Sequence, residues 1–465
     1  MRKSNIVTVI GLILFCVIII LPPLIHGYVY PGIGDDSAVH LNMMNLMINE
    51  GYNPVFHMYF GYSFVAYPII WLHQWLGWSI DTIYLWFSYS MLILSGLVIY
   101  FAISRLINKF AGWLALLIVL FCSQSVLFQF YYGILFNMIN MGVIFPLLIY
   151  SAVLYINENK RKYLVATLLF VFLFAVFHTS GIYLPIFISL AICVYILYNV
   201  IKHKRIEKRL VWVSLVAIAL SVGSILIFIP DFFVIVKTYE DAITKALAVP
   251  LTDYLYSIVS IITIIIVLVL LPFVMDKWGS KLEPKYKTVI FLLIIPSLCL
   301  GGAIVLKLAS DPFRQALDLS TILALLASVL TGIIILKFKQ KWITVGILLL
   351  IGFGLYHNLP TWFGYNNAIT MADQQAIEYV NTVEGECYNT SDTIAHWVYQ
   401  RFINKKFTDA TDVGLLITRN EPMTPRSTEG NHWYKEPTEK FIPDDSYSEV
   451  KEFVDGEVVV KVYEK

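Results

Sequence analysis

The stretch IVTVIGLILFCVIIILPPLI, residues 6–25, decides the fold class, because about 20 consecutive apolar residues can cross a bilayer as one helix. It lacks the small-residue cleavage site that ends a secretory signal, so we expect it to be retained as a first span. Similar apolar runs follow as far as residue 360. The chain is 58% hydrophobic and only 14% charged, against about 25% charged residues in soluble domains. The sequence therefore predicts an α-helical polytopic membrane protein.

The basic residues between the apolar runs predict the orientation. They form groups at 2–3, 105–109, 160–162, 202–209, 277–287 and 337–341. The four other basic residues before residue 360 are Lys237, Lys245, Lys307 and Arg314, which lie in the alternate loops. Basic loops stay on the cytoplasmic side of a membrane. We therefore expect a plasma-membrane protein with a cytoplasmic amino terminus and an extracytoplasmic carboxyl-terminal domain.

One apolar segment, MYFGYSFVAYPIIWLHQWLG at 58–77, is not counted as a span, because counting it would invert every later loop. Pro68 interrupts it, and Trp71, Trp75 and Trp78 suit a membrane interface. It is predicted to be a horizontal or re-entrant helix in a long outer loop, 26–80. The eleven predicted spans are 6–25, 82–103, 111–128, 134–155, 163–178, 181–200, 210–229, 254–275, 288–306, 315–336 and 342–359.

The chain is expected to divide into a transmembrane domain, 1–360, and a small extracytoplasmic α/β domain, 361–465. Helices are predicted at 372–381 and 393–402, strands at 386–390, 412–419 and 457–463, and a loop between Asn420 and Asp445. Only Cys387 of the five cysteines lies in this polar tail, so no disulfide is expected there. The sequon Asn389-Thr390-Ser391 raises surface glycosylation as an option.

Two adjacent carboxylates, Asp35 and Asp36, follow the first span and open a segment of helical period, 35–51. Its apolar face is predicted to carry Val39, Met43, Leu46 and Met47. One aspartate can serve as a helix cap. The second adds like-charge repulsion, which a bound cation, a cationic side chain or a hydroxyl that donates its proton would balance. The pair is thus read either as a cap or as part of a site.

The order of four segments carries a family resemblance. They are GDDSAVHL (34–41), YSFVAYPIIWLHQWLG (62–77), DPFRQALDL (311–319) and ADQQAIEYVN (372–381). An acidic pair, an interfacial helix, an arginine that begins a span and a polar tail, in this order, resemble the GT-C superfamily of membrane glycosyltransferases, with a layout like that of protein O-mannosyltransferases and aminoarabinose transferases. Oligosaccharyltransferases, of the same superfamily, carry a WWDYG-type signature where this chain has CYNTSDTIAHW (387–397). Transfer to asparagine sequons is therefore disfavoured.

The resemblance implies a GT-C-like fold and the transfer of a sugar from a polyprenyl-phosphate-linked donor to a glycan, lipid or protein acceptor. Asp35 or Asp36 would act as the catalytic base, and one of them, Asp36 by preference, would help to hold a divalent cation, Mg²⁺ or Mn²⁺. Arg314 and Lys307 would bind the donor phosphate. Alternatively, Arg314 is an interfacial anchor or pairs with Asp311 or Asp318, and Lys307 extends along the span end to reach water.

Three further candidate groups are weighed against structural alternatives. His178 and His40 are candidate substrate contacts; His178 could instead bond a backbone carbonyl, and His40 lies one helical turn after Asp36. Glu240 and Asp241 could supply a second acidic group for the metal, or form a solvated helix face.

Two rival functions stay open. One is a non-enzymatic lipid or polysaccharide transporter or flippase, and the other is an assembly protein of the cell envelope. The ionisable residues lie mostly at span ends, which favours chemistry at the outer surface over passage through the membrane. Membrane lipids are expected partners, and no nucleic-acid partner is expected.

Overall fold

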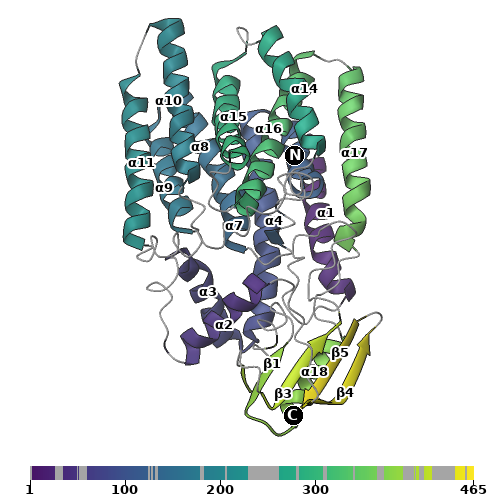
Figure 1. The fold of residues 1–465 in the computed structure, drawn as a ribbon. Coiled ribbons are helices and arrows are strands. Elements are labelled where there is room, and N and C mark those ends of the chain that lie inside the picture. Colours follow the sequence, from purple (N-terminus) through teal and green to yellow (C-terminus); the bar gives the residue numbers. More distant parts are fainter. Residues whose placement is uncertain are drawn as a thin grey trace.

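A computed structural model of the chain describes residues 3–26, 35–49, 51, 60–123, 126, 129–130, 135–177, 183–204, 207–228, 261–278, 282–306, 312–338, 341–363, 371–390, 399, 403, 405–407, 413–420, 446–455 and 458–465. These residues form a bundle of long helices with a small β-sheet at one end (Figure 1).

The apolar runs of the sequence form the helices of the bundle. They are α1 (Lys3–His26), α4 (Ile80–Leu106), α5 (Lys109–Leu117) with the π-helical turn η2 (Ile118–Cys122), α7 (Leu135–Ile139) with the π-helical turn η3 (Asn140–Ile144), α8 (Phe145–Glu158), α9 (Arg161–Phe177), α10 (Tyr183–His203), α11 (Lys208–Phe228), α14 (Ile261–Trp278), α15 (Pro284–Val305), α16 (Pro312–Phe338) and α17 (Lys341–Phe363). Each of the predicted span ranges overlaps one of these helical segments.

Within the residues that the structure describes, five helical segments are long and apolar enough to cross a membrane. They are Ile80–Leu106, Leu135–Glu158, Tyr183–Ile201, Pro284–Val305 and Gln315–Ile335. Shorter apolar helices lie at Thr8–Pro22, Lys109–Cys122, Thr263–Pro272 and Val345–Tyr356. The protein is therefore mostly helical with five candidate spans and a small sheet, and a crossing by all eleven predicted segments stays a prediction.

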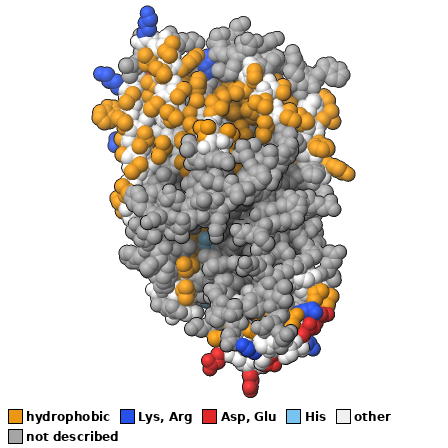
Figure 2. Space-filling view, viewed as in Figure 1, with side chains coloured by type: hydrophobic (Ala, Val, Ile, Leu, Met, Phe, Trp, Pro, Cys, Tyr) orange, Lys and Arg blue, Asp and Glu red, His pale blue; other side chains and the backbone are white. Residues whose placement is uncertain are grey.

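The burial of side chains separates a central helix from peripheral ones. α16 is the most enclosed candidate span and packs against α5, α14 and α15. The outer helices instead expose apolar side chains, which form a broad orange belt in Figure 2. They include Val165 and Leu169 of α9, Leu190 and Leu197 of α10, Trp212 and Leu215 of α11, and Leu348 and Phe353 of α17. Such a surface fits hydrocarbon rather than water.

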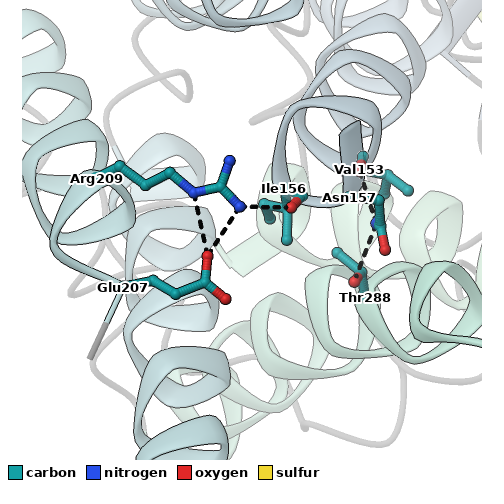
Figure 3. Close-up of polar contacts among 6 residues, drawn as sticks. All are labelled: Val153, Ile156, Asn157, Glu207, Arg209 and Thr288. Carbon is teal, nitrogen blue, oxygen red and sulfur yellow. Dashed lines mark hydrogen bonds and ion pairs between the residues drawn. The ribbon is translucent and has the colours of Figure 1, made fainter. Parts of the chain in front are cut away.

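Polar contacts join the helix ends farthest from the sheet (Figure 3). Arg209, at the start of α11, donates two hydrogen bonds to the Glu207 carboxylate (3.1 and 2.8 Å) and one to the carbonyl oxygen of Ile156 in α8 (3.2 Å). The Asn157 amide donates to the Thr288 hydroxyl of α15 (3.3 Å). The bond from Arg209 satisfies one of the carbonyl oxygens that the end of α8 itself leaves unpaired.

The basic loops of the sequence meet at this same end. The Lys285 ammonium of α15 donates to the carbonyl oxygen of Arg105 at the end of α4 (2.8 Å). Figure 2 shows Lys and Arg side chains at this end, and both acidic and basic side chains at the opposite end, over the sheet. The grouping agrees with the charge pattern, while the side of the membrane on which it lies stays a prediction.

The carboxyl-terminal sheet has the strand order β2-β1-β3-β5-β4. Its strands are β1 (Cys387–Thr390), β2 (Lys406–Phe407), β3 (Leu415–Arg419), β4 (Ser448–Asp455) and β5 (Val458–Glu464). β1 runs parallel to β2 and β3, and β5 pairs antiparallel with β3 and β4. The helix α18 (Met371–Thr382) lies against β4 and β5. The predicted helix at 372–381 and three predicted strands are confirmed.

The other predictions for the tail have mixed outcomes. The helix expected at 393–402 falls outside the described residues except for Tyr399, and the loop expected between Asn420 and Asp445 does so after Asn420. Asn389 is only 8% exposed and its side-chain oxygen accepts from the Thr390 amide (2.7 Å). The expectation that this sequon offers a surface glycosylation site is therefore wrong in the folded chain.

A buried ion pair ties α18 to the sheet. The Arg419 guanidinium of β3 donates to both carboxylate oxygens of Asp373 (3.1 and 3.4 Å), and the Tyr399 hydroxyl donates to one of them (2.6 Å). The two charged side chains are 4% and 0% exposed. A buried pair of this kind is costly to break because one charge would be left uncompensated.

Candidate functional site

The structure describes the backbone, but not the side chains, of the three residues central to the predicted site. The helix α2 (Asp35–Asn49) begins at the acidic pair Asp35 and Asp36, and Arg314 lies in the first turn of α16. Four other candidates, His178, Lys307, Glu240 and Asp241, lie outside the described residues. Their roles stay predictions.

The helix α2 is fixed to its surroundings around His40. This side chain is 4% exposed, and its ring meets the Phe136 ring of α7 edge to face, with centroids 4.7 Å apart. The Tyr62 hydroxyl donates to the carbonyl oxygen of His40 (2.5 Å). In this conformation His40 is a packing residue, and its predicted contact with substrate stays a prediction.

The predicted apolar face of α2 is right in part: Met43 and Met47 pack partly buried against the core, and the side chain of Val39 is not described. The structure buries His40, Leu41 and Met44, whereas Leu46 is exposed. Asparagines and methionines alternate along α2, so the difference in hydrophobicity between its faces is small. The aromatic rings of Tyr62 and Phe136 therefore decide its rotation by packing on His40.

The helix α3 (Phe60–Leu76) also packs against α2. Tyr62, on its buried face, contacts α2, and Gly61 lies directly against the backbone of Val176 and Phe177 in α9. The opposite face exposes Trp71 and Trp75, whose rings stack with centroids 5.6 Å apart. At 17 residues with a proline inside, α3 is not among the described helices that are long and apolar enough to span. This geometry fits the predicted interfacial helix.

A buried polar cluster lies one turn along α16 from Arg314. The fully buried Asp318 carboxylate accepts hydrogen bonds from the Asn137 amide of α7 (3.1 Å) and the Tyr183 hydroxyl of α10 (2.6 Å). Gln315, in the same part of α16, is 5% exposed, and its side-chain oxygen accepts no hydrogen bond within the described part of the chain. Buried ionisable groups in membrane helices are rare and commonly functional.

Sequence reasoning missed this cluster. The sequence suggested Asp318 as a possible partner of Arg314, which stays a prediction, and not as an acceptor for α7 and α10. Asn137 and Tyr183 were not considered at all. The two asparagines in this otherwise apolar run, Asn137 and Asn140, were the available signal, because such residues need hydrogen-bond partners on other helices.

Two adjacent residues of α7 link the two predicted halves of the site. Phe136 contacts His40 of α2, the helix that begins at the acidic pair. Asn137 bonds Asp318 of α16, the helix that holds Arg314. α7 is therefore a shared support for both helices.

The predicted metal site cannot be built from what is described. Among the residues whose positions the structure gives, no group of three or more His, Cys, Asp or Glu side chains could hold an ion. The side chain of Asp36, and all of Glu240 and Asp241, fall outside that set. The divalent cation stays part of the proposal.

No family profile and no curated protein matches this chain. Among solved structures, the apo crystal structure of the oligosaccharyltransferase of Archaeoglobus fulgidus is similar, with a TM-score of 0.46 and 11% sequence identity. The similarity covers 89% of this chain and 65% of that chain. This chain thus spans about two thirds of the length of that structure, and the activity proposed below depends on this chain's own residues.

Proposed function

We propose that this chain is a GT-C-like integral-membrane glycosyltransferase. It transfers a sugar from a polyprenyl-phosphate-linked donor to a glycan, lipid or protein acceptor on the outer side of the membrane. The observation that carries the proposal is the pair of contacts on α7. Phe136 supports the helix that begins with the acidic pair, and Asn137 supports the helix of Arg314. An acid–base group and a phosphate-binding cation on one rigid support suit group transfer.

In the proposed reaction, Asp35 or Asp36 removes the proton from an acceptor hydroxyl. The hydroxyl oxygen then forms a bond to the anomeric carbon of the sugar, and the bond from that carbon to the phosphate oxygen breaks. General-base assistance of this kind contributes about 10²- to 10⁴-fold to the rate. The aspartate that is not the base caps α2 or helps to hold a cation.

Arg314 serves the other side of the same step. The departing phosphate keeps the electron pair of the broken bond, and a guanidinium can bind two of its oxygens at once. This contact stabilises charge that grows during the reaction. The polyprenyl chain of the donor would lie against the apolar surface of the bundle.

A divalent cation fits the proposal through the chemistry of its ligands, because carboxylate oxygens are the groups that Mg²⁺ and Mn²⁺ prefer. Asp36 would hold it, and it would supply positive charge beside the donor phosphate. Transfer should then stop on chelation and resume when Mg²⁺ or Mn²⁺ is added.

The direct test uses the purified full chain in lipid nanodiscs with labelled polyprenyl-phosphate sugars and extracts of glycans, lipids and proteins as acceptors. Appearance of label on an acceptor, with release of polyprenyl phosphate, is the expected result. The matched variant is Arg314→Ala, which should weaken donor binding as well as turnover. In proteoliposomes, movement of labelled lipid across the bilayer without any transfer would instead identify a flippase and refute the proposal.

A further inference from the structure

We infer that Asp318 is a positioning residue: its carboxylate ties α16 to α7 and α10 and thereby holds Arg314 in place for the donor phosphate. This inference rests on the proposed function, since it assigns Asp318 a role through Arg314. Asp318 itself is not proposed to touch substrate.

The hydrogen bonds of Asp318 differ in kind from those of the other polar residues of α16. The Asn137 amide and the Tyr183 hydroxyl reach it from two other helices. By contrast, the hydroxyls of Thr321 and Ser328 donate to carbonyl oxygens one turn earlier in α16 itself. Side-chain bonds within one helix do not connect it to its neighbours. The two hydrogen bonds of Asp318 tie α16 to α7 and α10.

Because Asp318 is buried, the loss of either of its hydrogen bonds costs free energy. Asp318 and Asn137 are fully buried, and a hydrogen bond in such surroundings is electrostatically stronger than one in water. Both donors point to carboxylate oxygens, one to Oδ1 and the other to Oδ2. The substitution Asp318→Asn would keep one acceptor oxygen and would present an amide hydrogen to the other donor.

The hydrogen bonds of Asp318 lie close to Arg314 along α16, so their loss can affect the predicted phosphate-binding residue. Arg314 precedes Asp318 by about one turn of α16, so both belong to the same rigid helical segment. Tyr183 is the first residue of α10, and Asn137 lies beside the residue that supports α2. Loosening α16 here would shift Arg314 relative to the acidic pair. A displacement of about 1 Å can reduce a rate by about 10²-fold.

The test compares Asp318→Asn and Tyr183→Phe with the matched control Ser328→Ala, which removes a buried hydroxyl whose described hydrogen bond stays within α16. Donor KM and kcat are measured in the full chain in nanodiscs, and amide hydrogen exchange is followed over residues 312–318. We expect Asp318→Asn to raise donor KM by on the order of 10-fold, with a smaller rise for Tyr183→Phe and none for Ser328→Ala. Exchange over 312–318 should rise in the same order.

The outcomes separate this inference from the proposed function. Wild-type protein that transfers sugar, together with an Asp318→Asn variant of unchanged KM and unchanged exchange, refutes the positioning role alone. A fall in kcat without any change in KM also refutes it, since it would place Asp318 in the chemical step. Wild-type protein that transfers no sugar refutes the proposed function, whatever the exchange data show. If Asp318→Asn and Ser328→Ala change donor KM and amide exchange equally, Asp318 contributes to packing only, and the positioning role is refuted.

Discussion

Gly61→Ala tests whether the docking of the first outer loop controls activity. A Cβ at position 61 would lie 2.7 Å from the carbonyl oxygen of Val176 and 2.8 Å from that of Phe177, with the Phe177 Cα in contact as well. All three atoms belong to the backbone of α9, so no side chain can rotate away. The helix α3 must therefore move.

The size of the effect follows from these contacts. Ordinary contact begins at 3.4 Å, so α3 must shift by roughly 1 Å, with an overpacking cost of about 1–3 kcal/mol. Alanine has a higher helix propensity than glycine, which offsets about 1 kcal/mol of this cost. The net loss of stability is therefore small. Through the Tyr62–His40 hydrogen bond, however, α2 moves with α3, and a shift of that size lowers the transfer rate by about 10²-fold.

The control is Gly223→Ala in α11, where an added Cβ meets nothing within 4 Å. We expect this variant to keep the wild-type transfer rate and an equal or slightly higher melting temperature. The assay is sugar transfer in nanodiscs, with thermal unfolding measured on the same preparations. A wild-type transfer rate in a folded Gly61→Ala protein would refute the inference that the packing of α3 against α9 positions α2.

Two further predictions concern single polar contacts. Tyr62→Phe, which removes the hydroxyl bonded to the His40 carbonyl, should lower the free energy of unfolding by about 1 kcal/mol and slow transfer less than Gly61→Ala; an unchanged melting temperature would contradict this. Asp373→Asn should destabilise the carboxyl-terminal sheet by about 3–5 kcal/mol because Arg419 keeps a buried, uncompensated charge. In limited proteolysis of the full chain, Asp373→Asn should be cleaved earlier in the tail than the wild type. The control is Lys461→Met, which removes exposed ion pairs. Equally early cleavage of the two variants would contradict the prediction.

The helices of the bundle could be predicted because hydrocarbon demands long apolar runs, and such runs are visible in one sequence. Contacts between helices could not. Asp318 stands near a span end in the sequence, which suggested a loop, and only the structure brings Asn137 and Tyr183 to it. These partners are 181 and 135 residues away along the chain, and no local pattern encodes such pairings.

The strand β4 shows a different limit. It is an edge strand whose side chains are mostly exposed, so it lacks the apolar alternation that identifies a strand. Glu449, Lys451 and Glu452 are typical of edges that avoid pairing with other chains. The dipeptide Asp455-Gly456 before β5 was a usable hairpin signal that the sequence reasoning passed over.

The central claim is that the acidic pair at the start of α2 supplies the base for sugar transfer. It is tested most directly by single-turnover transfer from a labelled polyprenyl-phosphate sugar in Asp35→Asn and Asp36→Asn, with donor binding measured on the same samples. We expect the transfer rate of one variant to fall by about 10²- to 10⁴-fold, while its donor affinity stays close to that of the wild type. Wild-type rates in both variants would contradict it.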